Sequence, residues 1–199
     1  MKTTANFLLQ CPALILSFAG LLFQATAWAQ VPPSAAEVAR YSGLHAAAQR
    51  GDVAQIQRLA TAATVNTVDS YGRTPVHVAS FAKQREAIQA LVKAGADLSK
   101  LESDRYDAVT IASVADDEET LRVLLQLGAS AKLTTSRYDG TALIAAAHLG
   151  HDGVVRQLIQ AGAPLDHVNN LHWTAAIEAV VLGDGGKRHQ STLKALIDA

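Results

Sequence analysis

The fold is decided by residues 69–97, which begin with the stretch DSYGRTPVHVA and end with LVKAGAD. Thr74 and Pro75 are typical of a helix start, because Thr caps free backbone N–H groups and Pro at the first helical position loses no hydrogen bond. Gly95 suits the left-handed residue that ends a second helix. The segment therefore predicts a pair of short helices.

The same unit recurs along the chain about every 33 residues. Each unit ends in an apolar pair, and successive pairs are 32, 33, 34 and 38 residues apart: Ile56/Leu59, Ile88/Leu91, Leu121/Leu124, Val155/Leu158 and Leu193/Leu196. A unit of this size cannot bury its apolar face alone, so neighbouring units must stack. We therefore predict an all-α solenoid of about five repeats, at residues 43–67, 68–100, 101–133, 134–166 and 167–199.

The stretch Thr74-Pro75-Val76-His77-Val78-Ala79 resembles the T-P-L-H-x-A signature of the ankyrin repeat, and partial versions of it cover residues 43–199 in the same register. The resemblance implies helix–turn–helix repeats with short β-hairpin fingers. It also implies that His45 and His77, which share the fourth position of the signature, bond to neighbouring backbone. A recognition module is therefore favoured over an enzyme.

Residues 1–29 are predicted to be a signal peptide. Lys2 supplies the positive start, an apolar run covers residues 13–23, and Ala27-Trp28-Ala29 matches the small-residue cleavage pattern, so cleavage is expected before Gln30. The alternative is a membrane anchor, but a spanning helix needs about 20 apolar residues and this run is shorter. We expect a periplasmic or secreted protein without membrane contact after cleavage, similar to exported bacterial ankyrin proteins.

The composition of the predicted mature chain excludes several classes of function. The full chain has 17 basic and 18 acidic residues. Loss of the one lysine in the signal peptide leaves 16 basic against 18 acidic residues, a net charge of −2, which offers no basic excess for nucleic acid. Cys11 is the only cysteine and lies in the signal peptide, so the mature chain has no disulfide and no thiolate site.

Two segments flank the regular repeats. Residues 30–42 are expected to form a linker with a short helix, because Ser34 and Glu37 have capping-box spacing. At the other end, the turn between the two helices of the last repeat is longer and includes residues 182–189. The final helix is expected at residues 190–199, and it lacks the Gly-Ala ending of repeats two to four. We therefore expect the last repeat to be incomplete.

Three further positions depart from the repeat pattern. Arg105 stands where repeat two has Gly72, and the finger of repeat four is expected to be one residue shorter, between Gly140 and Thr141. Glu178 occupies an inward-facing position that is apolar in repeats two to four, so its carboxylate needs a partner. We expect that partner to be fingertip backbone or the inserted loop. The alternative is a buried acid at a binding surface.

No catalytic constellation is found in the sequence. The chain lacks the nucleophile-elbow, zinc-protease and P-loop motifs, and residues 183–187 do not have P-loop spacing. We predict neither catalytic residues nor a cofactor or metal. The alternative is an accessory protein that binds a small molecule or metal through finger and loop histidines, which have no acidic or cysteine residue at ligand spacing: His148, His167, His172 and His189.

We expect a monomer that binds another protein through a concave surface, made by the fingers and the outer side of the first helices. Its Tyr, Trp and Arg residues are the types that dominate interface energies. The alternative is that the aromatic side chains pack between adjacent fingers. The expected contact residues are Tyr71, Arg73, Phe81, Arg105, Tyr106, Arg137, Tyr138, His148 and Trp173.

Overall fold

The computed structural model describes residues 31–199, so the predicted signal peptide and its cleavage site lie outside the described residues. A short helix, α1 (Ala35–Val38), precedes five helix–turn–helix pairs. The pairs are α2 (Gly43–Arg50) with α3 (Val53–Leu59), α4 (Pro75–Phe81) with α5 (Arg85–Lys93), α6 (Ala108–Val114) with α7 (Glu118–Gln126), α8 (Ala142–His148) with α9 (Asp152–Gln160), and α10 (Ala175–Val181) with α11 (Lys187–Asp198).

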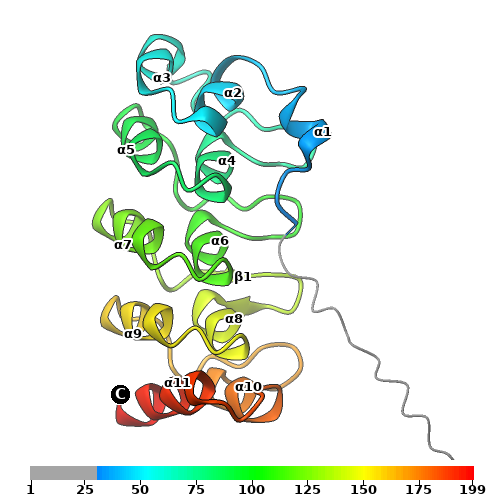
Figure 1. Cartoon of the computed structure of the whole chain (residues 1–199), viewed down its shortest axis with the longest axis vertical. Coiled ribbons are helices and arrows are strands. Elements are labelled where there is room, and N and C mark those ends of the chain that lie inside the picture. The colour runs from blue at the N-terminus through cyan, green and yellow to red at the C-terminus, as the bar shows by residue number, and fades with distance from the viewer. Residues whose placement is uncertain (1–30) are drawn as a thin grey trace, which may run out of the picture.

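The pairs stack into two layers of helices (Figure 1). First helices lie against first helices and second helices against second helices, and the fingers project from the same side of the stack (Figure 1). The predicted all-α solenoid is confirmed. No helix in residues 31–199 is long and apolar enough to cross a membrane.

Side-chain caps and left-handed residues set the helix ends. The carboxylates of Asp52, Asp107 and Asp117 each accept a hydrogen bond from a backbone N–H in the first turn of the following helix. The turns between paired helices need one left-handed residue each. Glycine supplies it in repeats one and four, whereas Lys83 and Asp116 adopt φ values of 57° and 53° at the same place in repeats two and three.

The core is a ladder of apolar side chains between the layers. The predicted pairs in the middle of the stack, such as Ile88 with Leu91 and Leu121 with Leu124, are fully buried. Leu59 in the first repeat is 36% exposed, because α3 has a neighbouring second helix on one side only. The final pair is partly buried for the same reason.

Small residues allow the first helices to approach closely. The position six residues after the N-cap of the first helix is Ala48, Ser80, Ser113 and Ala147 in repeats one to four, and all four side chains are buried. Val180 holds that position in repeat five and is 59% exposed. The described chain therefore presents an uncovered apolar face on α10.

The finger of repeat four differs from the expectation. Its strands β1 (Thr134–Thr135) and β2 (Gly140–Thr141) pair Thr135 with Gly140, which leaves four residues in the turn. In repeat two, the N–H of Asp69 bonds to the carbonyl of Arg73 and leaves three residues. These two pairs are not equivalent, because Ser136 closes its finger as Asp69 does and both residues stand five positions before the N-cap threonine of the next helix, so the two fingers have the same length. The prediction of a shorter finger was wrong because it aligned Gly140 with Gly72.

The turn between the two helices of repeat five is shorter than expected. α10 ends at Val181, and α11 begins at Lys187 instead of the predicted Gln190. Gly186 is the N-cap residue of α11, and its N–H donates to Oδ1 of Asp184 at 2.8 Å. Lys187 and Arg188, which were predicted to lie in the turn, are therefore in the first turn of a helix.

Candidate partner-binding surface

Each finger is closed at its base by an oxygen atom of one side chain. In repeat two, Oδ1 of Asp69 accepts hydrogen bonds from the backbone N–H groups of Tyr71 and Arg73, at 2.8 and 2.9 Å. In each later finger a side-chain oxygen likewise accepts from the backbone N–H groups two and four residues further along the chain. The residues that supply this oxygen are Glu102 in repeat three, Ser136 in repeat four and Asn169 in repeat five. The tip side chains are therefore not needed to hold the turn.

Backbone hydrogen bonds join adjacent fingers. The N–H of Ser103 donates to the carbonyl of Tyr71 at 3.0 Å, and the N–H of Asn170 donates to the carbonyl of Tyr138 at 2.9 Å. The finger of repeat four is joined to that of repeat three in the same way. The four fingers therefore form a continuous surface and not a row of separate loops.

The predicted arginines of the middle fingers bind neighbouring fingers. Arg105 forms an ion pair with Asp139 at 2.8 Å, and Arg137 forms one with Asp104. About half of each arginine side chain is exposed, so these pairs contribute little to stability and both side chains remain accessible to a partner. Arg105 also adopts φ 66°, the left-handed conformation that Gly72 has at φ 71°.

The predicted aromatic residues fall into two groups. Tyr71 and Tyr138 are 46% and 42% exposed at the tips of their fingers. Phe81, Tyr106 and Trp173 are half-buried. Burial raises the pKa of the Tyr106 hydroxyl. Tyr71 and Tyr138 are therefore accessible to a partner, whereas much of each of the other three side chains is covered by the chain itself.

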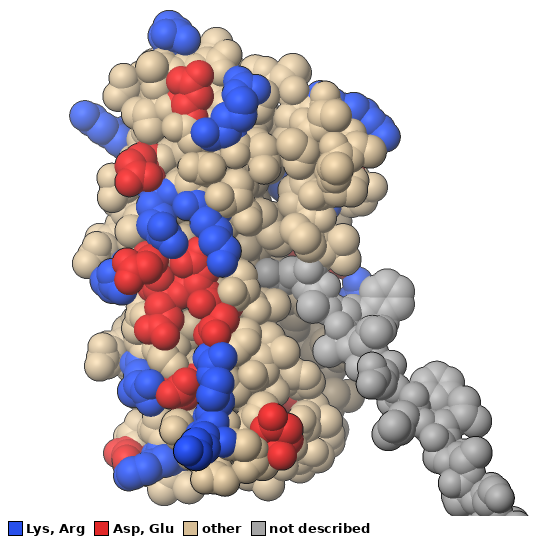
Figure 2. All heavy atoms as spheres, in the orientation of Figure 1, with Lys and Arg blue, Asp and Glu red and all other residues tan. Residues whose placement is uncertain are grey.

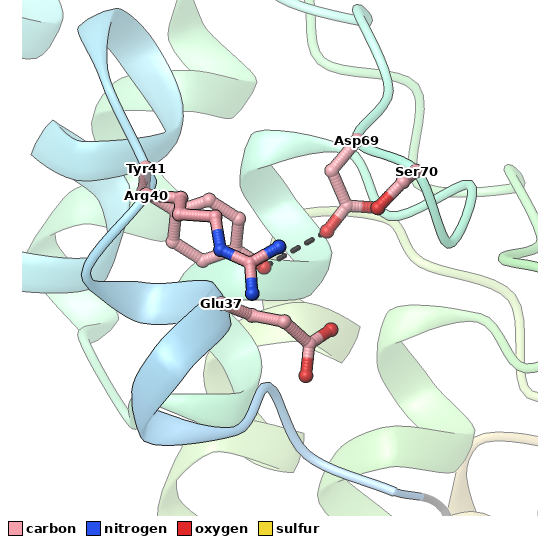
Figure 3. Close-up of a pocket in the computed structure, with 5 residues that line it drawn as sticks. All are labelled: Glu37, Arg40, Tyr41, Asp69 and Ser70. Atoms are coloured by element: carbon pink, nitrogen blue, oxygen red, sulfur yellow. Dashed lines mark hydrogen bonds between the residues drawn. The ribbon is translucent and has the colours of Figure 1, made fainter.

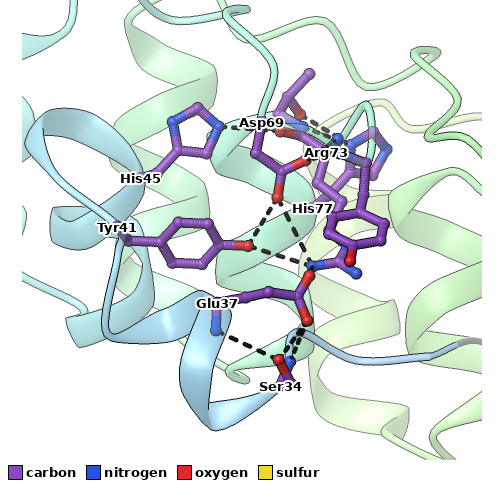
Figure 4. A network of polar contacts seen from close by, with 9 residues as sticks. Ser34, Glu37, Tyr41, His45, Asp69, Arg73 and His77 are labelled. Carbon is purple, nitrogen blue, oxygen red and sulfur yellow. Dashed lines mark hydrogen bonds and ion pairs between the residues drawn. The ribbon is translucent and has the colours of Figure 1, made fainter.

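Arg73 is buried in a polar network (Figure 4). Its Nη1 lies 3.1 Å from Oε1 of Glu37, 3.4 Å from the hydroxyl of Tyr41 and 3.7 Å from Oδ2 of Asp69. Its guanidinium also lies over the ring of Tyr71, 4.5 Å from the centroid. The side chain is 3% exposed, so Arg73 is not part of the partner-binding surface. It fastens α1 to the finger of repeat two.

A small cavity lies beside this network (Figure 3). Glu37, Arg40 and Tyr41 line it from α1 and the residues after it, and Asp69 and Ser70 line it from the finger (Figure 3). The Tyr41 hydroxyl donates to Oδ2 of Asp69 at 2.8 Å. Burial raises the pKa of Tyr41 to about 12, so its proton stays in this hydrogen bond at neutral pH.

The histidines of the signature position serve the fold. Nε2 of His45 bonds to the carbonyl of Arg73 and Nε2 of His77 to that of Lys100, both at 2.9 Å. The N–H of Thr74 donates to Nδ1 of His77, which fixes a neutral ring with its proton on Nε2. Burial lowers the pKa of His77 to about 4. The structural role that the resemblance implied for both histidines agrees with these bonds.

The four histidines of the metal-binding alternative do not converge. His167 bonds to the carbonyl of Asp139 at 2.6 Å, and His189 lies between Oδ1 of Asp184 and the carbonyl of His148. His172 is exposed at a finger tip with φ 63°. Residues 31–199 contain no group of three side chains placed to hold a metal ion. The geometry therefore does not favour this alternative.

Glu178 finds its partners in two side chains. Its carboxylate is 5% exposed; Oε1 accepts from the Asn169 amide, and Oε2 lies next to Nδ1 of His148, both at 2.9 Å. The prediction that Glu178 needs a partner is confirmed. The expected partners were wrong, because the side chain reaches the base of its own finger and the preceding helix α8 instead of fingertip backbone or the inserted loop.

Charged side chains gather on one edge of the stack, over the second helices and the turns that precede them (Figure 2). Arg85 pairs with Asp117 at 3.0 Å. Arg188, from the first turn of α11, pairs with Asp116 of repeat three at 2.9 Å and with Asp152 of repeat four at 3.4 Å. These carboxylates already have basic partners within the chain.

Comparison with known proteins supports the same architecture. Residues 30–102 and 108–199 match the family model described as ankyrin repeats (3 copies). The chain belongs to the ankyrin-repeat family. It is 32% identical to the ankyrin repeat protein YahD of Escherichia coli K12 over 154 residues, which is 76% of each protein. Ankyrin repeats are general protein–protein interaction modules.

Two further matches differ in the share of their own length that this chain covers. An ankyrin repeat domain from Acinetobacter baumannii AYE, known from a crystal structure, is 38% identical, with a TM-score of 0.72 over 78% of this chain and 79% of that one. Neurogenic locus notch homolog protein 1 of Xenopus laevis is 31% identical over 121 residues, which is 58% of this chain and 5% of that protein.

The ankyrin fingers carry a second row of apolar residues that was not predicted. Val68, Leu101 and Val168 stand one residue before the side chain that closes each finger, and they are 57%, 38% and 50% exposed. The signal was present in the sequence as an apolar residue at the same register position in three repeats. It was missed because only the tips of the fingers were considered.

Proposed function

We propose that this protein binds another protein through its ankyrin fingers and the adjoining ends of its first helices. The observation that supports this proposal is the distribution of exposed apolar side chains. Of the thirteen large ones in residues 31–199, six lie on the fingers: Val68, Tyr71, Leu101, Tyr138, Val168 and Leu171. Concentrated exposed apolar side chains of this kind are typical of interaction surfaces.

The ends of the first helices extend this surface in repeat five. Val181 and Leu182 are 56% and 45% exposed, and they follow the same register as Phe81 and Ala82 in repeat two. The hydrogen bonds at the finger bases hold the backbone independently of the tips, so the surface is preorganised. Preorganisation favours recognition by shape, which suits a non-enzymatic module.

Photo-crosslinking tests this surface directly. A benzoylphenylalanine residue at Tyr138 or Leu171 should give a discrete crosslinked protein in cells of the source organism. The matched control carries the same residue at Gln126, which is exposed on α7 in the layer of second helices. Equal crosslinking from Gln126, or none from either finger position, would reject the finger surface as the binding site.

We place this activity in the periplasm or outside the cell, because the sequence of residues 1–29 has the features of a signal peptide. The test is the mass of the protein recovered from the cell-envelope and culture fractions. A mature chain that begins at Gln30 supports export. A full-length chain that remains in the cytoplasm contradicts it and leaves the finger surface untouched.

A further inference from the structure

Glu178 is a buried carboxylate without a permanent cation beside it. Its hydrogen-bond partners are the neutral amide of Asn169 and the ring of His148. Among residues 31–199, no lysine or arginine lies within ion-pair distance of it. A buried carboxylate is costly unless its charge is compensated. The site therefore carries a net negative charge whenever the imidazole is neutral.

The geometry fixes which atoms of His148 are used. A carboxylate only accepts hydrogen bonds, so Nδ1 of His148 must carry a proton and donate it to Oε2 of Glu178. In the neutral ring Nε2 is then an acceptor. No atom of residues 31–199 bonds to this Nε2, and the side chain is 30% exposed. Glu178 therefore positions a hydrogen-bond acceptor at the surface of α8.

Apolar residues hold the position equivalent to His148 in other first helices. The register position of His148 is Phe81 in repeat two, Val114 in repeat three and Val181 in repeat five. Val181 is exposed on α10, which packs directly against α8 (Figure 1). The position thus combines a negatively charged dyad with an apolar neighbour.

The other charged groups nearby are already paired. His189 faces the carbonyl of His148 through Nε2 at 3.1 Å and Oδ1 of Asp184 through Nδ1 at 2.8 Å. Both ring nitrogens of His189 therefore face acceptors other than Glu178, one on Asp184 and one on the backbone of α8. The first turn of α11 directs Arg188 to Asp116 and Asp152. None of these groups supplies a cation to Glu178.

We infer that His148 and Glu178 form a binding position for a basic side chain of the protein partner. Its ammonium or guanidinium group donates to Nε2 of His148, and its aliphatic stem lies on Val181. A cation is favoured because it both donates the hydrogen bond and offsets the charge of the dyad. This inference rests on the proposed function, and it names the chemistry that one part of the surface recognises.

A titration followed by NMR tests the position without the natural partner. The probes are n-butylammonium chloride, which mimics a lysine side chain, and sodium butyrate, which has the same number of carbon atoms and the opposite charge. At pH 7.5 we expect saturable shifts of the His148 ring and the Val181 methyl groups with n-butylammonium, and about fivefold weaker binding of butyrate, which corresponds to about 1 kcal/mol. Equal binding of both probes, or preference for butyrate, would overturn the inference.

Variants test whether Glu178 positions His148 for binding or only stabilises the fold. E178Q removes the charge and keeps the shape, so the preference for n-butylammonium over butyrate should disappear while the chain stays folded. The matched control is E86Q, an exposed glutamate on α5, which should keep the preference. H148F introduces the residue that repeat two has here, and it should abolish the shifts. An unchanged preference in E178Q would contradict the role of Glu178.

The ring nitrogens give a readout that a purely structural role would not require. Long-range ¹H–¹⁵N spectra should show His148 with its proton on Nδ1 and a free Nε2. A proton on Nε2 instead would overturn the inference. The titration needs no protein partner, so the two failures can be told apart. A failure of crosslinking at the fingers would reject the proposed function on which this inference rests, and a failure of the titration would reject this position and leave the proposed function standing.

Discussion

Repeat two (residues 68–100) and repeat five (residues 167–199) use one backbone frame to bury polar groups in two ways. In repeat two the carboxylates of Glu37 and Asp69 meet a buried guanidinium, that of Arg73. In repeat five the carboxylate of Glu178 meets a neutral amide and the imidazole of His148. The first arrangement fastens two segments together, and the second leaves an unfilled hydrogen-bond acceptor at the surface. The repeat thus fixes the backbone position of each residue, whereas the charge and hydrogen bonding of the side chain at that position differ between repeats.

The two repeats also differ in what covers their first helix. Ser80 and Val180 share one register position, and they are 2% and 59% exposed. His77 and Ile177 share another, at 1% and 39%. The next repeat covers these positions in repeat two, whereas within the described chain they are uncovered in repeat five. The same substitution should therefore have very different effects in the two places.

The largest expected effect comes from a lysine at the shared position. S80K places an ammonium group between α4 and α6, at a position that is 2% exposed, and should reduce the free energy of unfolding by on the order of 5 kcal/mol. V180K places the same group in solvent and should change it by less than about 0.5 kcal/mol. Urea unfolding followed by circular dichroism compares them. Similar losses in both variants would show that repeat five is covered after all.

Removal of the buried guanidinium should have the next largest effect. R73A leaves Glu37 and Asp69 close together without a cation, so we expect a loss of about 3–4 kcal/mol. R105A removes an exposed ion pair from the next finger and should cost less than about 1 kcal/mol. Hydrogen exchange should also show faster exchange in α1 for R73A alone. Unchanged protection of α1 would mean that Arg73 does not hold it.

The stability of repeat two should depend on pH through His77. Its pKa in the folded chain is about 4, below the value of about 6.5 in an unfolded chain. The neutral ring therefore stabilises the fold above pH 6.5, and this contribution is lost as the pH falls towards 4, by about 2 kcal/mol between pH 7 and pH 5. H77Q should be less stable at pH 7 but should lose less on acidification. An equal loss in H77Q would assign the pH dependence to other groups.

The smallest expected effect concerns Glu178. E178V introduces the side-chain type that repeat two has as Val78, and replacement of a buried ion by an apolar residue is often close to neutral. We expect the free energy of unfolding to change by less than about 1 kcal/mol. A loss as large as that of R73A, measured in the same urea experiment, would show that both networks serve the fold equally and would weaken the contrast between the two repeats.

The sequence was sufficient to predict the stack, because the signals that define it are local and repeated. The interval between apolar pairs, the caps and the signature around Thr74 all act within one repeat. The placement of Arg73 could not be predicted in the same way. Its side chain is buried by α1, and no repeat rule describes where a segment 36 residues earlier will lie.

Two features were predicted in part, because they depend both on signals within one repeat and on contacts between repeats. The need of Glu178 for a partner is visible from its register, but the choice of His148 depends on how α8 and α10 pack. The finger of repeat four was predicted too short because Gly140 looks like the turn glycine, whereas it pairs with Thr135 across the hairpin and Asp139 takes the left-handed position of Gly72. The repeats themselves could be predicted from the sequence, whereas the side-chain contacts between repeats could not.

The side-chain oxygens at the finger bases have a consequence for how such a protein diversifies. Because Asp69, Glu102 and Asn169 each hold their own turn, a mutation at a tip does not disturb the hydrogen bonds that make the finger. Asp, Glu, Ser and Asn all supply the required oxygen, so even the base tolerates drift among these residues. Residues at the finger tips can therefore be substituted one at a time during evolution while the chain stays folded. Binding specificity can change in this way without a change in the fold.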